Sequence, residues 1–216
     1  MNAESRIAAA ALKRAVEWVK KQVRKDRENR YSLLHDWRLP ACRCSFWPDD
    51  IGHWETDLLR IERNAPGIVS ITVKAYQSTA EENVCDGATL SPDDIPGILP
   101  AALFHDPWYC RDARDGMQTF EALAFMLGVS SRTTRKFGDA LFYSIARAGG
   151  CNRFVAACYY AGIRIGYPLV KPFLSALAAF LLALAVGGCA GCVGPGDDGT
   201  FLDPSEFQFP TWEKVQ

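Results

Sequence analysis

The sequence predicts an α+β domain that is mostly α-helical, with a small β-hairpin, a helical bundle and one C-terminal transmembrane helix. Three features predict it: a hairpin pattern in residues 58–76, helical patterns in residues 100–165, and no charged residue in residues 172–196. The chain has 216 residues, 49% of them hydrophobic and 23% charged, which excludes wholesale disorder. The net charge of −1 argues against broad electrostatic binding to nucleic acid.

Residues 1–30 are expected to form a basic amphipathic helix, centred on residues 4–28. Aliphatic side chains recur every three to five residues, and nine Lys and Arg residues fall within the first 30 positions. Such a helix could lie on an anionic lipid leaflet, or pack on the domain with its charged face in water. The shallow apolar face at Ala8–Ala11 slightly favours packing on the domain.

Residues 31–170 are expected to form the α+β core domain. The segment 31–53 is aromatic and rich in turn residues, so we expect it to be irregular. A hairpin is predicted from strands at 58–62 and 68–76, with Asn64-Ala-Pro-Gly67 as the turn.

Four helices follow the hairpin in the predicted core. They are expected at residues 100–110, 118–127, 132–147 and 152–165. Ser130 or Ser131 should cap the third helix, and Gly149-Gly150 should end it.

Residues 171–196 are predicted to span a membrane. About 20 apolar residues at ~1.5 Å each are enough to cross a ~30 Å hydrocarbon core. Residues 1–171 hold 23 Lys and Arg against 20 Asp and Glu, whereas residues 172–216 hold one against five. This asymmetry predicts a cytoplasmic core domain and an acidic tail, residues 197–216, across the membrane. The alternative interpretation is a buried apolar helix.

The stretch Cys85–Arg111 carries the most chemical information. His105 and Tyr109 are four residues apart and should share a helix face, whereas Asp106 is rotated by about 100°. A neutral histidine can act as a general base near pH 7, and calcium prefers carboxylates with loop carbonyls. Asp139 lies in an apolar helical pattern and needs a partner, so it could hold the second nitrogen of His105.

The order of these motifs resembles a tailed-phage domain of unknown function and, more distantly, secreted bacterial phospholipase A2. The similarity covers residues 73–166 and rests on these matches: Asp86-Gly87-Ala88, Pro100–Asp106 with Tyr109, Gly138–Phe142 and Tyr160–Arg164. It departs from the phospholipases at Ala102, where they usually carry a disulfide-bonded cysteine just before the histidine. It departs from the phage domain at Leu90–Asp94, where a proline-basic pair is usual.

The resemblance implies a role for each matching residue. His105 would be the catalytic base, Asp139 its orienting partner, and Tyr109 a support of the catalytic site. A calcium ion would be held by Asp106 and by Asp86 and Gly87 of the loop, with the amide near Gly87 also facing the oxyanion.

Two functional hypotheses follow. The first is a membrane-anchored phage protein that hydrolyses phospholipids with calcium. The second is a non-catalytic phage virion or lysis-accessory protein, in which His105, Asp106 and Asp139 form a buried hydrogen-bond network. A nucleic-acid partner is not expected, because the faint helix-turn-helix pattern at residues 122–136 fits two packed helices better.

Overall fold

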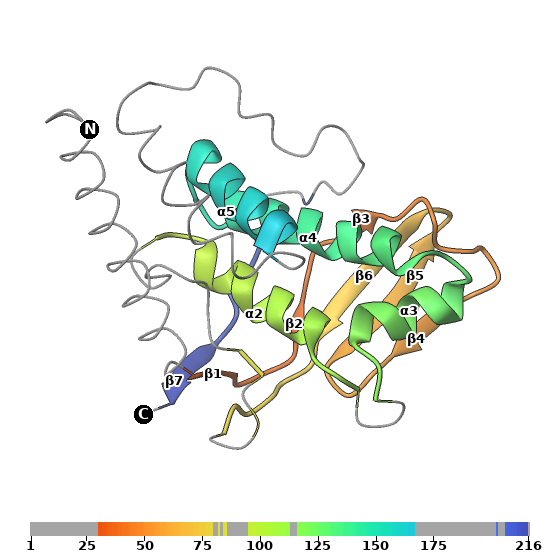
Figure 1. The fold of residues 1–216 in the computed structure, drawn as a ribbon, viewed down its shortest axis with the longest axis horizontal. Coiled ribbons are helices and arrows are strands. Elements are labelled where there is room, and N and C mark those ends of the chain that lie inside the picture. Colours follow the sequence, from red (N-terminus) through yellow and green to blue (C-terminus); the bar gives the residue numbers. More distant parts are fainter. Residues whose placement is uncertain are drawn as a thin grey trace, which may run out of the picture.

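A computed structural model describes residues 30–79, 82, 84–85, 95–112, 116–166, 202 and 206–215. In these residues the fold is α+β, with an N-terminal antiparallel sheet followed by four helices (Figure 1). The strands are β1 (Arg30–Leu33), β2 (Trp37–Arg38), β3 (Cys42–Arg43), β4 (His53–Glu55), β5 (Leu59–Ala65), β6 (Ile68–Val73) and β7 (Trp212–Val215).

The predicted hairpin is confirmed as the pair β5–β6. The two strands are antiparallel, with Ile61 opposite Ile71, and Gly67 in the turn has a positive φ of 65°. Leu59 and Ile61 are buried while Arg60 between them is exposed, which is the alternation of a sheet with one covered face.

Residues 31–53 are more regular than we predicted. Within them, β2 and β3 pair with β6, and β4, which ends at Glu55, pairs with β5. These strands have only two or three residues, too few for an alternating pattern to be visible in the sequence. The burial of side chains such as Trp37 and Cys42 holds these short strands in the sheet instead.

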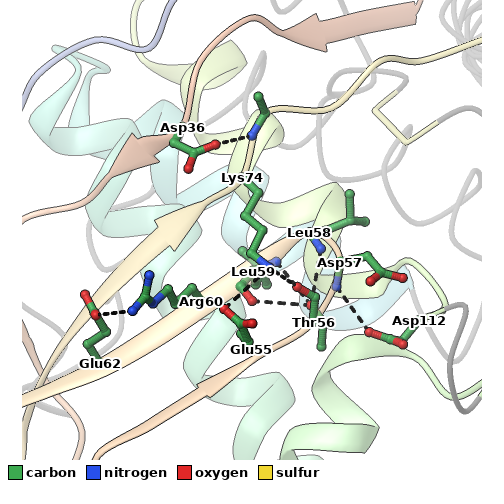
Figure 2. Close-up of polar contacts among 11 residues, drawn as sticks. Asp36, Glu55, Thr56, Asp57, Leu58, Leu59, Arg60, Glu62, Lys74 and Asp112 are labelled. Carbon is green, nitrogen blue, oxygen red and sulfur yellow. Dashed lines mark hydrogen bonds and ion pairs between the residues drawn. The ribbon is translucent and has the colours of Figure 1, made fainter.

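Several polar contacts hold the turn between β4 and β5 (Figure 2). The hydroxyl of Thr56 accepts from the backbone N–H of Leu59 at 3.1 Å, and Lys74 Nζ donates to the Thr56 carbonyl at 2.6 Å. The backbone N–H of Asp57 donates to Asp112, which follows the first described helix. This contact ties the end of the sheet to the helical region.

The four predicted helices are present within two residues of their expected bounds. They are α2 (Ile98–Tyr109), α3 (Thr119–Leu127), α4 (Ser131–Ala148) and α5 (Arg153–Gly166). Ser130 is the N-cap of α4 and accepts from the N–H of Thr133, while Gly149 follows the last turn. In Figure 1, α3 and α4 lie over the sheet, and α5 lies beside α4.

Pro107 lies inside α2, where proline normally costs a helix one hydrogen bond. The carbonyl left without its usual donor is that of Leu103, four residues earlier. The hydroxyl of Tyr76, in the segment after β6, donates to this carbonyl at 3.3 Å. A side chain from outside the helix thus satisfies the carbonyl that proline would leave bare.

The described part of the C-terminal tail packs on the core domain. β7 pairs with β1, Trp37 Nε1 donates to the carbonyl of Gln208 at 2.9 Å, and Leu202 is buried. Hydrogen-bonded strands must lie on the same side of any bilayer. This arrangement therefore differs from the prediction that the tail lies across a membrane from the core.

Two predicted segments, the basic helix at 1–30 and the span at 171–196, lie almost entirely outside the described residues. Within the described part of the chain, no helix is both long and apolar enough to cross a membrane.

Candidate functional site

The helix α2 carries the histidine and the tyrosine of the motif. Most of its side chains are buried, because it packs against both α3 and α4. His105 and Tyr109 are one helical turn apart on the side that faces α4, and their rings lie 4.6 Å apart. The histidine ring also contacts Phe142 of α4 at 5.4 Å, edge to face. The imidazole is therefore held on two sides by aromatic rings.

A glycine allows α4 to come close enough to α2. A Cβ atom built at Gly138 would lie 2.3 Å from Nε1 of Trp108, which is fully buried in α2. Any larger residue would force the indole or the whole helix to move. The next residue along α4 is Asp139, so this close contact of the two helices places its carboxylate beside His105.

The carboxylate of Asp139 accepts hydrogen bonds from two helices. Its side chain is only 1% exposed. Oδ1 accepts from the Tyr109 hydroxyl at 2.6 Å and lies 3.2 Å from Nε2 of His105, and Oδ2 accepts from the Arg164 guanidinium of α5 at 3.0 Å. This satisfies a buried charge, whose burial without partners would cost several kcal/mol.

These contacts shift the pKa values of both residues. Burial by itself lowers the pKa of His105, but hydrogen bonds and charges from Asp106 and Asp139 outweigh burial and raise it above 6.5. Burial also acts to raise the pKa of Asp139, but its contacts with His105, Tyr109 and Arg164 hold that pKa below 3.8. Asp139 is therefore ionised at neutral pH and suited to hold the N–H of the imidazole.

Asp106 lies on the other side of the histidine and is less completely bonded. Its Oδ1 lies 3.7 Å from Nδ1 of His105, and its side chain is 22% exposed. Its Oδ2 is buried and has no hydrogen-bond partner within the described residues. A buried carboxylate oxygen without a donor is suited to a cation, which needs an acceptor and not a donor.

Cys85 precedes the predicted calcium loop and acts on the same tyrosine as Asp106 does. Cys85, the residue before Asp86, is fully buried, and its thiol and the carboxylate of Asp106 both act on the hydroxyl of Tyr76. Together with burial, which contributes most, they raise the pKa of that tyrosine well above its ordinary value. Cys85 and Asp106 thus both lie within electrostatic range of the same tyrosine hydroxyl.

The structure brings three of the six predicted site residues into one hydrogen-bonded network: His105, Tyr109 and Asp139. Asp106 borders this network, whereas Asp86 and Gly87 lie outside the described residues. Among the described residues, no group of three or more His, Cys, Asp or Glu side chains is arranged to bind a metal ion. A calcium site would therefore need Asp106 together with ligands from the loop.

Arg164 completes the network, although no role for it was predicted from the sequence. In the sequence, Arg164 is distinguished only as the last residue of the Tyr160–Arg164 match and as a basic residue in an apolar helical pattern. Nothing in the sequence alone says that α5 turns this side chain toward Asp139, 25 residues earlier.

Comparison with known proteins supplies no assignment. No family model, curated protein or solved structure matches this chain. The arrangement of side chains is therefore the basis for the functional argument.

Proposed function

We propose that this protein is a calcium-dependent lipid hydrolase of the phospholipase A2 type that acts on phospholipids at a membrane surface. The observation that carries the proposal is the histidine between two unlike carboxylates. Asp139 binds one ring nitrogen and both of its oxygens are bonded, while Asp106 lies near the other nitrogen and has a buried oxygen with no partner among the described residues. One carboxylate can orient the base, and the other can hold a cation.

The chemistry follows from the two nitrogens of His105. In the neutral ring, the Nε2–H group donates a hydrogen bond to Asp139, which leaves Nδ1 as an acceptor. The side chain of His105 is 12% exposed. Nδ1 would take a proton from a water molecule while the oxygen of that water attacks the ester carbonyl. When the tetrahedral intermediate collapses, the imidazolium returns the proton to the leaving alcohol oxygen. The products are a fatty acid and a lysophospholipid.

Tyr109 and Asp139 would hold the ring through this cycle. Asp139 stabilises the imidazolium that forms, and the tyrosine hydroxyl fixes the carboxylate oxygen that faces Nε2. Asp106 would hold calcium together with Asp86 and Gly87, and its buried oxygen, which has no donor in the described part of the chain, fits that role. When bound, calcium would polarise the ester carbonyl and stabilise the negative charge that develops on its oxygen.

The membrane part of the proposal rests on residues 172–196, whose 25 positions carry no charge. Because β1 and β7 pair, this stretch would enter the bilayer without carrying the tail across it. It would place the site beside its lipid substrate, which raises the local substrate concentration. The similarity to a tailed-phage domain supports a phage origin.

Fatty-acid release from phospholipid vesicles, measured with calcium and with a chelator, tests the proposal. We expect release that needs calcium and that falls at least 1,000-fold in His105→Asn, because the base is lost. The matched control is His53→Asn, which changes an exposed histidine on β4 and should retain full activity.

The absence of release by folded protein under both conditions would contradict the proposal. It would favour the alternative, a non-catalytic phage virion or lysis-accessory protein that uses the same network as structural support. A His105→Asn variant with undiminished release would also contradict the role assigned to this residue.

A further inference from the structure

Arg164 is the permanently charged partner of Asp139. Its guanidinium comes from the last turn of α5 and donates to Oδ2 of Asp139 at 3.0 Å. The hydroxyl of Tyr109 binds the other oxygen as a neutral donor. An arginine keeps its charge at any physiological pH, so this contact balances the buried carboxylate whatever the state of its neighbours.

The contact also fixes how the carboxylate is turned. A carboxyl group held through one oxygen alone can rotate about its side-chain bond. Because Arg164 holds Oδ2, Oδ1 stays directed at His105 and Tyr109 on α2. The network therefore joins three helices, α2, α4 and α5, through one side chain.

We propose that Arg164 is a positioning residue of this site, and that docking of the last turn of α5 on α4 sets whether the site is competent. This inference rests on the proposed hydrolase function. Without the guanidinium, the carboxylate keeps two donors on one oxygen and, among the described residues, has none on the other. The orientation of the histidine ring, which Asp139 holds at 3.2 Å, then loses its support.

The first test replaces the guanidinium in the full-length chain. In Arg164→Met, kcat for vesicle hydrolysis should fall about 10- to 100-fold with little change in KM, as is usual for residues that orient catalytic groups. Arg164→Lys should recover part of the loss, and free guanidinium ion added to Arg164→Met should restore activity. Arg153→Met, an exposed change at the start of the same helix, is the matched control and should leave kcat unchanged.

The second test does not depend on hydrolysis. The imidazole N–H that is bonded to Asp139 should give a downfield proton resonance, which is assigned by its loss in His105→Asn. In Arg164→Met this resonance should shift or broaden, whereas in Arg153→Met it should not. A purely structural contact of α5 would lower thermal stability without moving this resonance.

The two tests separate this inference from the proposed function. If the wild-type protein releases no fatty acid, the hydrolase proposal fails, and the proton resonance still tests the role of Arg164. An unchanged kcat in Arg164→Met, or a resonance that does not move, would overturn the positioning role. Failure of guanidinium to restore any activity to a folded variant would overturn it as well.

Discussion

The two sides of His105 differ in how completely their polar groups are bonded. On the side of α4 and α5, Asp139 is 1% exposed and both of its oxygens have partners. On the opposite side, Asp106 is 22% exposed and one of its oxygens has no donor within the described residues. Buried polar groups in folded proteins are almost always bonded. The first side is therefore complete without a ligand, whereas the second side has an acceptor left for one.

This comparison predicts that the same chemical change has a large effect on stability at Asp139 and a small one at Asp106. Asp139→Asn should lower the free energy of unfolding by about 2–4 kcal/mol. The Asn side chain has only one acceptor oxygen, because its nitrogen is a donor, and the negative charge that binds Arg164 is lost. Thermal and urea denaturation of the full-length chain would measure this loss. A change below ~0.5 kcal/mol would mean that the network does not stabilise the fold.

The same variant should alter the dependence of stability on pH. The pKa of Asp139 is lower in the folded protein than its ordinary value of 3.8. Its contribution is therefore present above the unfolded value and is lost as the pH falls through the folded pKa. Wild-type protein should lose stability over this acid range, and the Asn variant should lose less. Parallel curves for the two proteins would contradict the lowered pKa.

Local patterns predicted the elements of this fold better than their contacts. The apolar spacing and the Ser130 cap placed the four helices, and Asn64–Gly67 marked the hairpin, because these signals act within a few residues. The pairing of β7 with β1 joins residues about 180 positions apart, and such a contact leaves no mark on either segment alone. Long-range pairing depends on the packing of the whole chain.

The site shows the same limit at the level of single side chains. A carboxylate in an apolar helix needs a partner, and this argument was enough to connect Asp139 with His105. It could not select Arg164 among the basic residues of the helical region, since only the packing of α5 brings that guanidinium to the carboxylate. The role of Gly138 was equally hidden, because it depends on where the indole of Trp108 lies.

Gly138→Ala tests how closely α2 and α4 must approach. The new methyl group would lie 2.3 Å from Nε1 of Trp108, and the fully buried ring has little room to move. Overpacking of this kind costs about 1–3 kcal/mol, offset in part by about 1 kcal/mol that alanine gains over glycine within a helix. We expect a net loss of up to about 2 kcal/mol in chemical denaturation. Gly52→Ala, which has open space around it, should change stability by less than ~0.5 kcal/mol.

The hydrolytic site should be disturbed along with the packing in Gly138→Ala. Asp139 is the next residue on α4, so a shift of the helix moves its carboxylate away from Nε2 of His105. Calcium-dependent release should therefore fall more than the fraction of unfolded protein explains. A stable variant with full activity would show that the close approach of the two helices is not needed for the site.

Asp106→Asn should have the smallest effect on stability and the clearest effect on calcium. Removing a charge whose Oδ2 has no donor in the described residues should change the free energy of unfolding by less than ~1 kcal/mol in the absence of calcium. In wild-type protein, calcium should raise the melting temperature, because a ligand that binds only the folded state stabilises it. In Asp106→Asn this rise should disappear, whereas Asp57→Asn, on the turn between β4 and β5, should keep it. If calcium stabilises the wild-type protein and Asp106→Asn equally, Asp106 is not a ligand, and its free oxygen needs a different partner.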